Sequence, residues 1–197
     1  MTAVEERPPR RIEGSDMAGK PAGKGSVPER CDIVGDASSL TFFAMSTSNP
    51  VYGRATELRG FIEVTWNADG AIVADPAPKM HVEFAVETLR TGNELQDREM
   101  WKLIDSKRFP KIAGDLLELG PGALPGRYIA GGQITLAGLA RRYEGEFTVQ
   151  RDVQHVTLDG NLNIDVRDFG LKPLNLLVLS VAPLVRVRVH VIAARTV

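Results

Sequence analysis

The sequence predicts an all-β fold, an antiparallel barrel of about eight strands with one short helical insertion and a disordered N-terminal tail. Three observations lead to this prediction. Apolar and polar residues alternate through most of the chain, short turn-like segments separate the alternating runs, and only one stretch has a helical period. Periodicity alone leaves a two-sheet sandwich open, whereas closing the strands into a barrel removes exposed edges.

Length and composition fit one globular domain with a tail. The chain has 197 residues, of which 43% are hydrophobic, and its formal net charge of -1 gives no general attraction to nucleic acid or anionic membranes. The single cysteine, Cys31, excludes an intrachain disulfide. We find no signal-peptide core near the start and no apolar run long enough to span a membrane, so we expect a cytoplasmic protein.

Residues 1–29 are predicted to form the disordered tail, and residues 30–197 the barrel domain. The tail is rich in proline, glycine and charged residues, and it cannot bury enough apolar surface to offset the entropy lost on ordering. A docking arm for a partner is the alternative reading of this segment.

Period-two alternation predicts the strands in chain order. In a half-solvated strand, alternate side chains face the core and the solvent, and a slip of one residue would invert the two faces. Gly131 and Gly132 interrupt one run and indicate a bulge or a corner. The predicted strands are 39–45, 58–66, 80–87, 112–119, 128–138, 143–149, 156–166 and 185–192.

The helical insertion lies between Thr88 and Lys111. Met100, Leu103 and Ile104 stand at helical spacing and give the segment one apolar edge. Asn93 is a suitable N-cap, with Gln96 placed three residues later as in a capping box, and Pro110 prevents continuation. A short helix at this place could close one end of a barrel.

A second closing element is expected between the last two predicted strands. Residues 169–184 are apolar, but Lys172, Pro173, Asn175 and Pro183 break the run, which makes it too short and too interrupted to cross a bilayer. We interpret it as a buried loop or lid over an apolar cavity.

Four short motifs stand in series: Thr91-Gly92-Asn93 with Asp97, Phe109-Pro110-Lys111-Ile112, Gly132 to Gly138, and Asp165 to Gly170. In their order and spacing they resemble those of the YceI-like, polyisoprenoid-binding family. The resemblance extends from about Cys31 to Val197 and implies a lipocalin-like antiparallel barrel that binds a long isoprenoid or similar amphiphilic lipid in its lumen and commonly pairs as a homodimer. Two histidines frequent in the family are replaced here, by Glu99 and Ala137.

The main functional hypothesis is therefore a non-enzymatic barrel that binds, stores or transports such a lipid. The helical segment Thr91–Lys111 and the loop Leu171–Leu179 would close the lumen. In a structural or interaction barrel, the same apolar positions would simply be a filled core. The predicted lumen wall consists of Phe42, Ile62, Val64, Trp66, Val82, Phe84, Phe147, Ile164, Val187 and Val189.

An enzyme acting on a small apolar substrate is the third hypothesis, and the sequence gives it little support. It would need Tyr128 or Tyr143 next to a histidine or carboxylate inside the barrel. Cys31 has no histidine near it in sequence and is interpreted as a structural thiol. We predict no catalytic residue and no cofactor.

The remaining polar features are interpreted as structural. His81, His155 and His190 lie on three separate elements, so no metal site is predicted. Asp165, Arg167 and Asp168 are read as an ion-paired turn. Arg186, Arg188 and His190 form a basic stripe, but their strand lacks aromatic residues that could stack on bases, so we interpret the stripe as a solvated face and predict no nucleic-acid partner.

Overall fold

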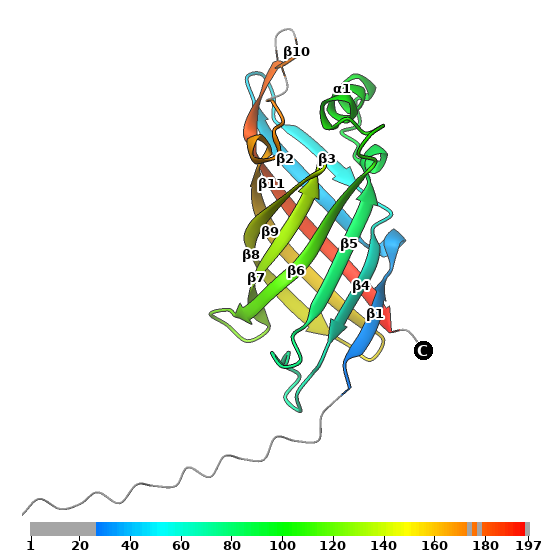
Figure 1. Ribbon diagram of the computed structural model, residues 1–197, viewed down its shortest axis with the longest axis vertical. Helices are drawn as coiled ribbons and strands as arrows, with labels where there is room; N and C mark the ends of the chain where they lie inside the picture. The colour runs from blue at the N-terminus through cyan, green and yellow to red at the C-terminus, as the bar shows by residue number, and fades with distance from the viewer. Residues whose placement is uncertain (1–26, 173–174, 177–178, 196–197) are drawn as a thin grey trace, which may run out of the picture.

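The computed structural model describes residues 27–172, 175–176 and 179–195 and forms a closed antiparallel β-barrel of eight strands, with one α-helix at its upper end (Figure 1). This architecture confirms the predicted fold class. The strands are β1 (Glu29–Ile33), β2 (Ser39–Ser46), β3 (Val51–Ala55), β4 (Arg59–Val64), β5 (Lys79–Ala85), β6 (Lys111–Pro121), β7 (Arg127–Leu136), β8 (Leu139–Arg151), β9 (His155–Asp165), β10 (Asn175–Leu176) and β11 (Leu179–Arg195). The helix is α1 (Glu94–Ile104), and three short 3₁₀ turns are η1 (Gly35–Ala37), η2 (Val86–Thr88) and η3 (Val166–Phe169).

Two of the eight barrel strands are bent, and each of these two consists of two segments: β1 with β2, and β3 with β4. β1 and β2 pair one after the other with the same edge of β11, through Cys31 opposite Arg195 and Ser39 opposite His190. β4 pairs with β1 and β3 pairs with β2 in the same way. The strand order β4-β5-β6-β7-β8-β9-β11 then closes through β1.

Ser38 restores the ladder where η1 interrupts the first bent strand. Its side chain is 1% exposed, its hydroxyl donates to the carbonyl oxygen of Ile192 at 3.2 Å, and the N–H of Ile192 donates back to it at 3.0 Å. The Val34 N–H also donates to the Ile192 carbonyl, at 2.8 Å. A side chain thus satisfies a buried backbone amide that would otherwise have no partner across the bend.

The structure contains strands that were not predicted. β1, β3 and β10 had not been identified, and β11 begins at Leu179, so residues 179–184 of the expected 169–184 loop are strand. β3 is only five residues long and contains Gly53, where a Cβ would overlap the ring of Phe42. A glycine in so short a run removes the alternation that identifies a strand.

The N-terminal boundary also moves slightly. The predicted tail falls mostly on residues 1–26, which lie outside the described residues, but Glu29, assigned to the tail, is the first residue of β1. Its carboxylate accepts hydrogen bonds from Arg151 at 2.8 Å and from Arg195. The first described strand is therefore tied to β8 and to the end of β11 at the lower end of the barrel.

The predicted bulge is present, with its extra residue in the neighbouring strand. Between β6 and β7, the register shifts so that Leu116 faces Gly132 while Glu118 faces Gly131, which leaves Leu117 without a partner in the ladder. A Cβ at Gly132 would lie 3.0 Å from the carbonyl oxygen of Asp115. The glycines allow the two backbones to approach closely at this bend.

Asn93 caps α1 as predicted, accepting from the N–H groups of Leu95 at 3.0 Å and Gln96 at 3.2 Å. The reciprocal bond expected from Gln96 is instead made by Thr91, whose hydroxyl accepts from the Asn93 N–H at 3.2 Å. The helix ends at Asp105, which adopts a left-handed conformation with φ of 58°.

Replacing Ser38 by alanine is expected to destabilise the barrel by about 1–3 kcal/mol, because the Ile192 N–H would be left buried and unpaired. Chemical denaturation, compared with that of Ser48→Ala at an exposed position, measures the effect. Equal unfolding free energies for the two variants would contradict the role assigned to Ser38.

The hydrogen bonds that Glu29 accepts from Arg151 and Arg195 predict a specific loss of stability in acid. Hydrogen bonding to Arg195 lowers the pKa of Glu29 against a smaller opposing effect of burial. A depressed pKa in the folded state contributes stability above the unfolded pKa, and that stability is lost as pH falls through the folded pKa. Glu29→Gln should therefore lower the melting temperature at neutral pH, and the difference from wild type should shrink below about pH 4.

Glu87→Gln is the matched control for this experiment, since Glu87 is exposed on η2 and forms no ion pair with any residue that the structure describes. It should leave the melting temperature close to the wild-type value at every pH. If the melting temperature of Glu29→Gln stayed equally far below that of wild type in acid, the stabilising role of the Glu29 carboxylate would be contradicted.

Candidate functional site

The interior of the barrel contains two adjoining apolar cavities. The upper cavity has a volume of about 250 Å³ and lies beneath α1, which contributes Met100, Leu103 and Ile104 to its wall. The lower cavity, of about 130 Å³, lies toward Trp66 and Val149. The two cavities adjoin in the middle of the barrel, where five residues line both, and we refer to the pair as the lumen. The shared residues are Val82, Gly114, Ile134, Leu162 and Val189.

All ten residues of the predicted wall lie along this lumen. Phe42, Phe84, Ile164 and Val187 line the upper cavity, while Ile62, Val64, Trp66 and Phe147 line the lower one; Val82 and Val189 line both. The strands therefore have the expected phase, with Phe84 7% and Val189 8% exposed. Contact of these residues with a ligand stays a prediction.

Of the residues at the middle of the lumen, Val82 and Val189 were predicted, whereas Ile134 and Leu162 were missed. Ile134 and Leu162 lie on the apolar phases of predicted strands and could have been added to the wall from their alternation. Glycines 131, 132 and 138, together with Gly114, indicate a lightened interior in the sequence, and the structure places Gly114 at the middle of the lumen. A Cβ there would meet only Val82 Cγ1, at 3.4 Å, so the absence of a side chain at Gly114 leaves space where the two cavities join.

The lumen offers few polar groups. Thr91 and Gln96 are among the residues lining the upper cavity, and Lys79, Asp115, Gln133 and Tyr143 are among those lining the lower one; the side chains of Lys79 and Asp115 make ion pairs with Glu63 and His81. The Trp66 Nε1 atom is buried and has no hydrogen-bond partner among the described residues. Such a lining favours a ligand held by its hydrophobic length, with at most isolated polar contacts.

A buried carboxylate fixes α1 over the upper cavity. Asp97 is 3% exposed and accepts hydrogen bonds from both the N–H and the hydroxyl of Thr91, each at 2.7 Å. Trp101 Nε1 donates to the carbonyl oxygen of Leu89 at 3.1 Å. Asp97 and Trp101 are four residues apart and lie on one face of the helix, so these bonds tie that face to the segment before α1 and hold the helix as a cover.

Tyr143 does not have the surroundings of a catalytic acid or base. Its hydroxyl donates to Asp168 Oδ2 at 2.6 Å, and burial together with this carboxylate raises the pKa of Tyr143 to about 12. At neutral pH the phenol stays protonated and serves as a structural donor. Asp165 binds Arg167 at 2.6 Å and caps η3, which confirms the predicted ion-paired turn.

The thiol and the imidazoles also have structural surroundings. Cys31 is completely buried, and desolvation, with the charge of Glu29, raises its pKa to about 11. His81 lies 2.7 Å from Asp115, and His190 lies 2.8 Å from Asp159. Within the part of the chain that the structure describes, no group of three or more His, Cys, Asp and Glu residues is arranged to hold a metal ion.

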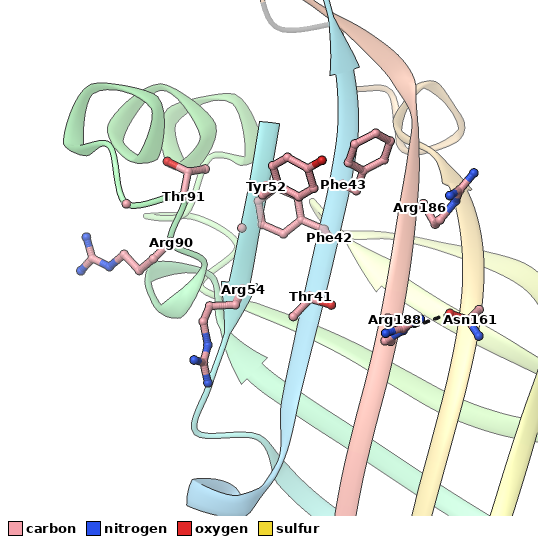
Figure 2. Close-up of a pocket in the computed structure, with 12 residues that line it drawn as sticks. Thr41, Phe42, Phe43, Tyr52, Arg54, Arg90, Thr91, Asn161, Arg186 and Arg188 are labelled. Atoms are coloured by element: carbon pink, nitrogen blue, oxygen red, sulfur yellow. Dashed lines mark hydrogen bonds between the residues drawn. The ribbon is translucent and has the colours of Figure 1, made fainter. Parts of the chain in front are cut away.

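A third cavity lies outside the barrel, where β2, β3 and β11 meet the segment before α1 (Figure 2). This open groove has a volume of about 910 Å³ and contains Arg186 and Arg188 from the predicted basic stripe. The third residue of the stripe, His190, is not part of the groove. β11 supplies no aromatic residue to the groove, but its neighbours do: Phe43 of β2 and Tyr52 of β3 line the same groove.

Comparison with known proteins gives a consistent result. The sequence model of the YceI-like domain matches residues 32–193. No curated protein matches the chain at a significant level. No helix among the described residues has the length and apolar character needed to cross a membrane.

Several solved structures share the fold at low sequence identity. Burkholderia cenocepacia BcnA is 18% identical, with a TM-score of 0.68, over 82% of this chain and 99% of its own. A polyisoprenoid binding domain from Saccharophagus degradans, implicated in plant cell wall breakdown, is 14% identical, with a TM-score of 0.65, over 86% and 100%. The Campylobacter jejuni YCEI protein is 13% identical, with a TM-score of 0.60, over 95% and 100%.

The phase of the strands can be tested at two neighbouring positions on β5. Phe84→Asp would place an unpaired carboxylate in the apolar lumen and should cost several kcal/mol of stability. Glu83→Leu would remove outer contacts with Lys111, at 2.7 Å, and with His81, at 3.9 Å, and should cost about 0–1 kcal/mol. Thermal melts compare the two; a larger loss in Glu83→Leu would mean that the barrel is inside out.

Proposed function

The chain belongs to the YceI-like domain family, and on this premise we propose that its lumen binds, stores or transports a long-chain isoprenoid or similar amphiphilic lipid. The observation that carries the proposal is the pair of adjoining apolar cavities that runs through the barrel under α1. The structurally similar protein from Saccharophagus degradans is a polyisoprenoid binding domain, which supports the same ligand class.

The dimensions of the lumen favour a slender chain. Typical pockets for small ligands have volumes of about 300–1,000 Å³. The cavities here, about 250 and 130 Å³, are smaller than that range. A single flexible chain could thread both cavities through their common middle. Each CH₂ group buried contributes about 0.8 kcal/mol, so length alone can give tight binding without a strong polar anchor.

A non-enzymatic role fits the chemistry of the site better than catalysis. The titratable groups beside the lumen are engaged structurally, Tyr143 with Asp168 and Asp115 with His81. An enzyme acting on a small apolar substrate would need two such groups converging on the cavity with shifted pKa values suited to proton transfer. The structural or interaction barrel with a filled core is the remaining alternative, and the two cavities argue against it.

Two further features of the proposal come from the resemblance and the composition. Homodimer formation is proposed from the family resemblance, and the mass of the protein in solution tests it. A cytoplasmic location is consistent with the unpaired buried thiol of Cys31, and cell fractionation tests it.

Native mass spectrometry of the purified protein is the direct test of the proposed function. We expect the barrel to carry a long-chain lipid after expression, or to take up a polyprenol after lipid removal. A protein that neither carries nor acquires such a lipid would contradict the proposal.

Blocking the middle of the lumen gives a sharper prediction. Gly114→Leu places a side chain where the cavities join and should weaken binding of a polyprenol at least tenfold, equivalent to about 1.4 kcal/mol. Gly120→Leu is the matched control on the same strand, since the neighbouring Leu119 faces the lumen and a Cβ at Gly120 has only one contact, at 4.0 Å.

Titration of delipidated protein with a fluorescent polyprenol measures both affinities, and circular dichroism checks that both variants fold. Unchanged affinity in a folded Gly114→Leu protein would show that the chain does not pass through the junction.

A further inference from the structure

The outer groove between β3 and β11 concentrates positive charge although the chain as a whole has a net charge of -1. Arg54, Arg90, Arg186 and Arg188 line it, and no aspartate or glutamate does. In Figure 2, Arg54 and Arg90 lie on one side of Phe42, Phe43 and Tyr52, and Arg186 and Arg188 lie on the other. The groove is therefore a basic surface with an aromatic centre.

Three of the four groove arginines have no carboxylate partner among the described residues. Most other described arginines do, such as Arg30 with Glu63 at 2.8 Å and Arg127 with Glu146 at 2.7 Å, although Arg59, Arg108 and Arg141 do not. In the groove, Arg54, Arg186 and Arg188 have no carboxylate within ion-pair distance; Arg188 has only Asn161 Oδ1, at 3.5 Å, and Arg186 lies over the ring of Phe43. Arg90 lies 3.8 Å from Asp97 and stacks on Trp101. Exposed guanidinium groups without a carboxylate partner are available to bind phosphates.

Apolar side chains are exposed beyond this basic band, toward the upper end of the barrel. Met45 lies near the end of β2 and is 54% exposed, and Leu184 on β11 is 56% exposed. On α1, which also lies at the upper end, Leu95 is 56% exposed. Tyr52, 64% exposed, is level with Arg186, since both are paired with Phe43, and Arg54 and Arg188 lie one row lower. An apolar tip, followed by a row with a tyrosine and an arginine and then by two more arginines, matches the order of layers from acyl chains to phosphates at a membrane surface.

The groove also adjoins the lumen. Phe42 and Thr91 line both the groove and the upper cavity, so the wall between them is one side chain thick there. β3 is joined to the segment before α1 by a single bridge, between Arg54 and Arg90. A surface that binds phosphates would thus hold the upper cavity close to the source of a lipid chain.

We propose that the upper end of this barrel docks on anionic phospholipid bilayers, with Arg54, Arg186 and Arg188 on the lipid phosphates and Met45, Tyr52 and Leu184 in the boundary region. Docking itself is independent of what the lumen holds, whereas a role in exchanging lipid with the membrane rests on the proposed function. An extended nucleic acid would be expected to need base stacking along a continuous groove, and the exposed apolar tip has no use in that case.

Co-sedimentation with vesicles tests the proposal. Wild-type protein should bind vesicles of mixed phosphatidylglycerol and phosphatidylcholine, should not bind phosphatidylcholine alone, and should be released partly by salt. The triple variant Arg54→Gln, Arg186→Gln, Arg188→Gln should bind roughly a hundredfold more weakly, because each arginine near an anionic surface contributes about fivefold.

Two control proteins separate location from total charge and total hydrophobicity. The triple variant Arg30→Gln, Arg127→Gln, Arg142→Gln loses the same charge at sites with carboxylate partners and should bind vesicles as wild type does. Met45→Ser with Leu184→Ser should reduce the binding that remains at high salt, whereas Leu117→Ser with Leu124→Ser, also exposed, should not.

Equal vesicle binding by the two arginine variants would overturn the proposal. So would absence of wild-type binding to anionic vesicles, or binding to single-stranded DNA in its place. Polyprenol uptake from detergent is measured in parallel and should be unchanged in the groove variant, so failure of docking and failure of lumen binding give different results.

Discussion

The barrel depends on one strand that is long enough to have two partners on the same edge. β11 has 17 residues; it pairs along one side with β9, and on the other side first with β2 and then with β1. The register along β11 sets which side chains of four strands face inward, since a shift by one residue would invert them. Ser38 keeps this register through the break at η1 by replacing a backbone group in the ladder.

Much of the architecture could be predicted from alternation alone. The strands with strong alternation, such as β9 and the second half of β11, were identified with the correct inward face, and so were the N-cap of α1 and the turn at Asp165. β1 and β3 were missed because each is five residues long and derives its structure from neighbours distant in sequence. β3 in particular is specified by its fit to Phe42 and by the bridge to Arg90, and local sequence contains neither contact.

The candidate site was also predicted only in part. The lumen wall follows from the phase of the strands, so its residues could be chosen from the sequence. Space in the lumen was indicated by four glycines, Gly114 among them, but its place was not, because strand pairing sets Gly114 opposite Val82 where the two cavities meet. The aromatic side chains of the groove were not predicted, for a different reason. β11 supplies the arginines while β2 and β3 supply the aromatic residues, and strand pairing alone brings them together.

Because two strands are bent, two separate sets of backbone hydrogen bonds close the barrel, one at each end. At the lower end, β1 and β4 complete a ladder that is reinforced by Glu29, Arg151 and Arg195. At the upper end, the wall beside α1 is completed by one pair of hydrogen bonds, between the backbones of Arg54 and Arg90, at 2.8 and 2.9 Å. Breaking that pair does not require the lower ladder to open. The amide protons of Arg54 and Arg90 should therefore exchange with solvent through local fluctuations, and those of the β1–β4 ladder only when the whole barrel unfolds.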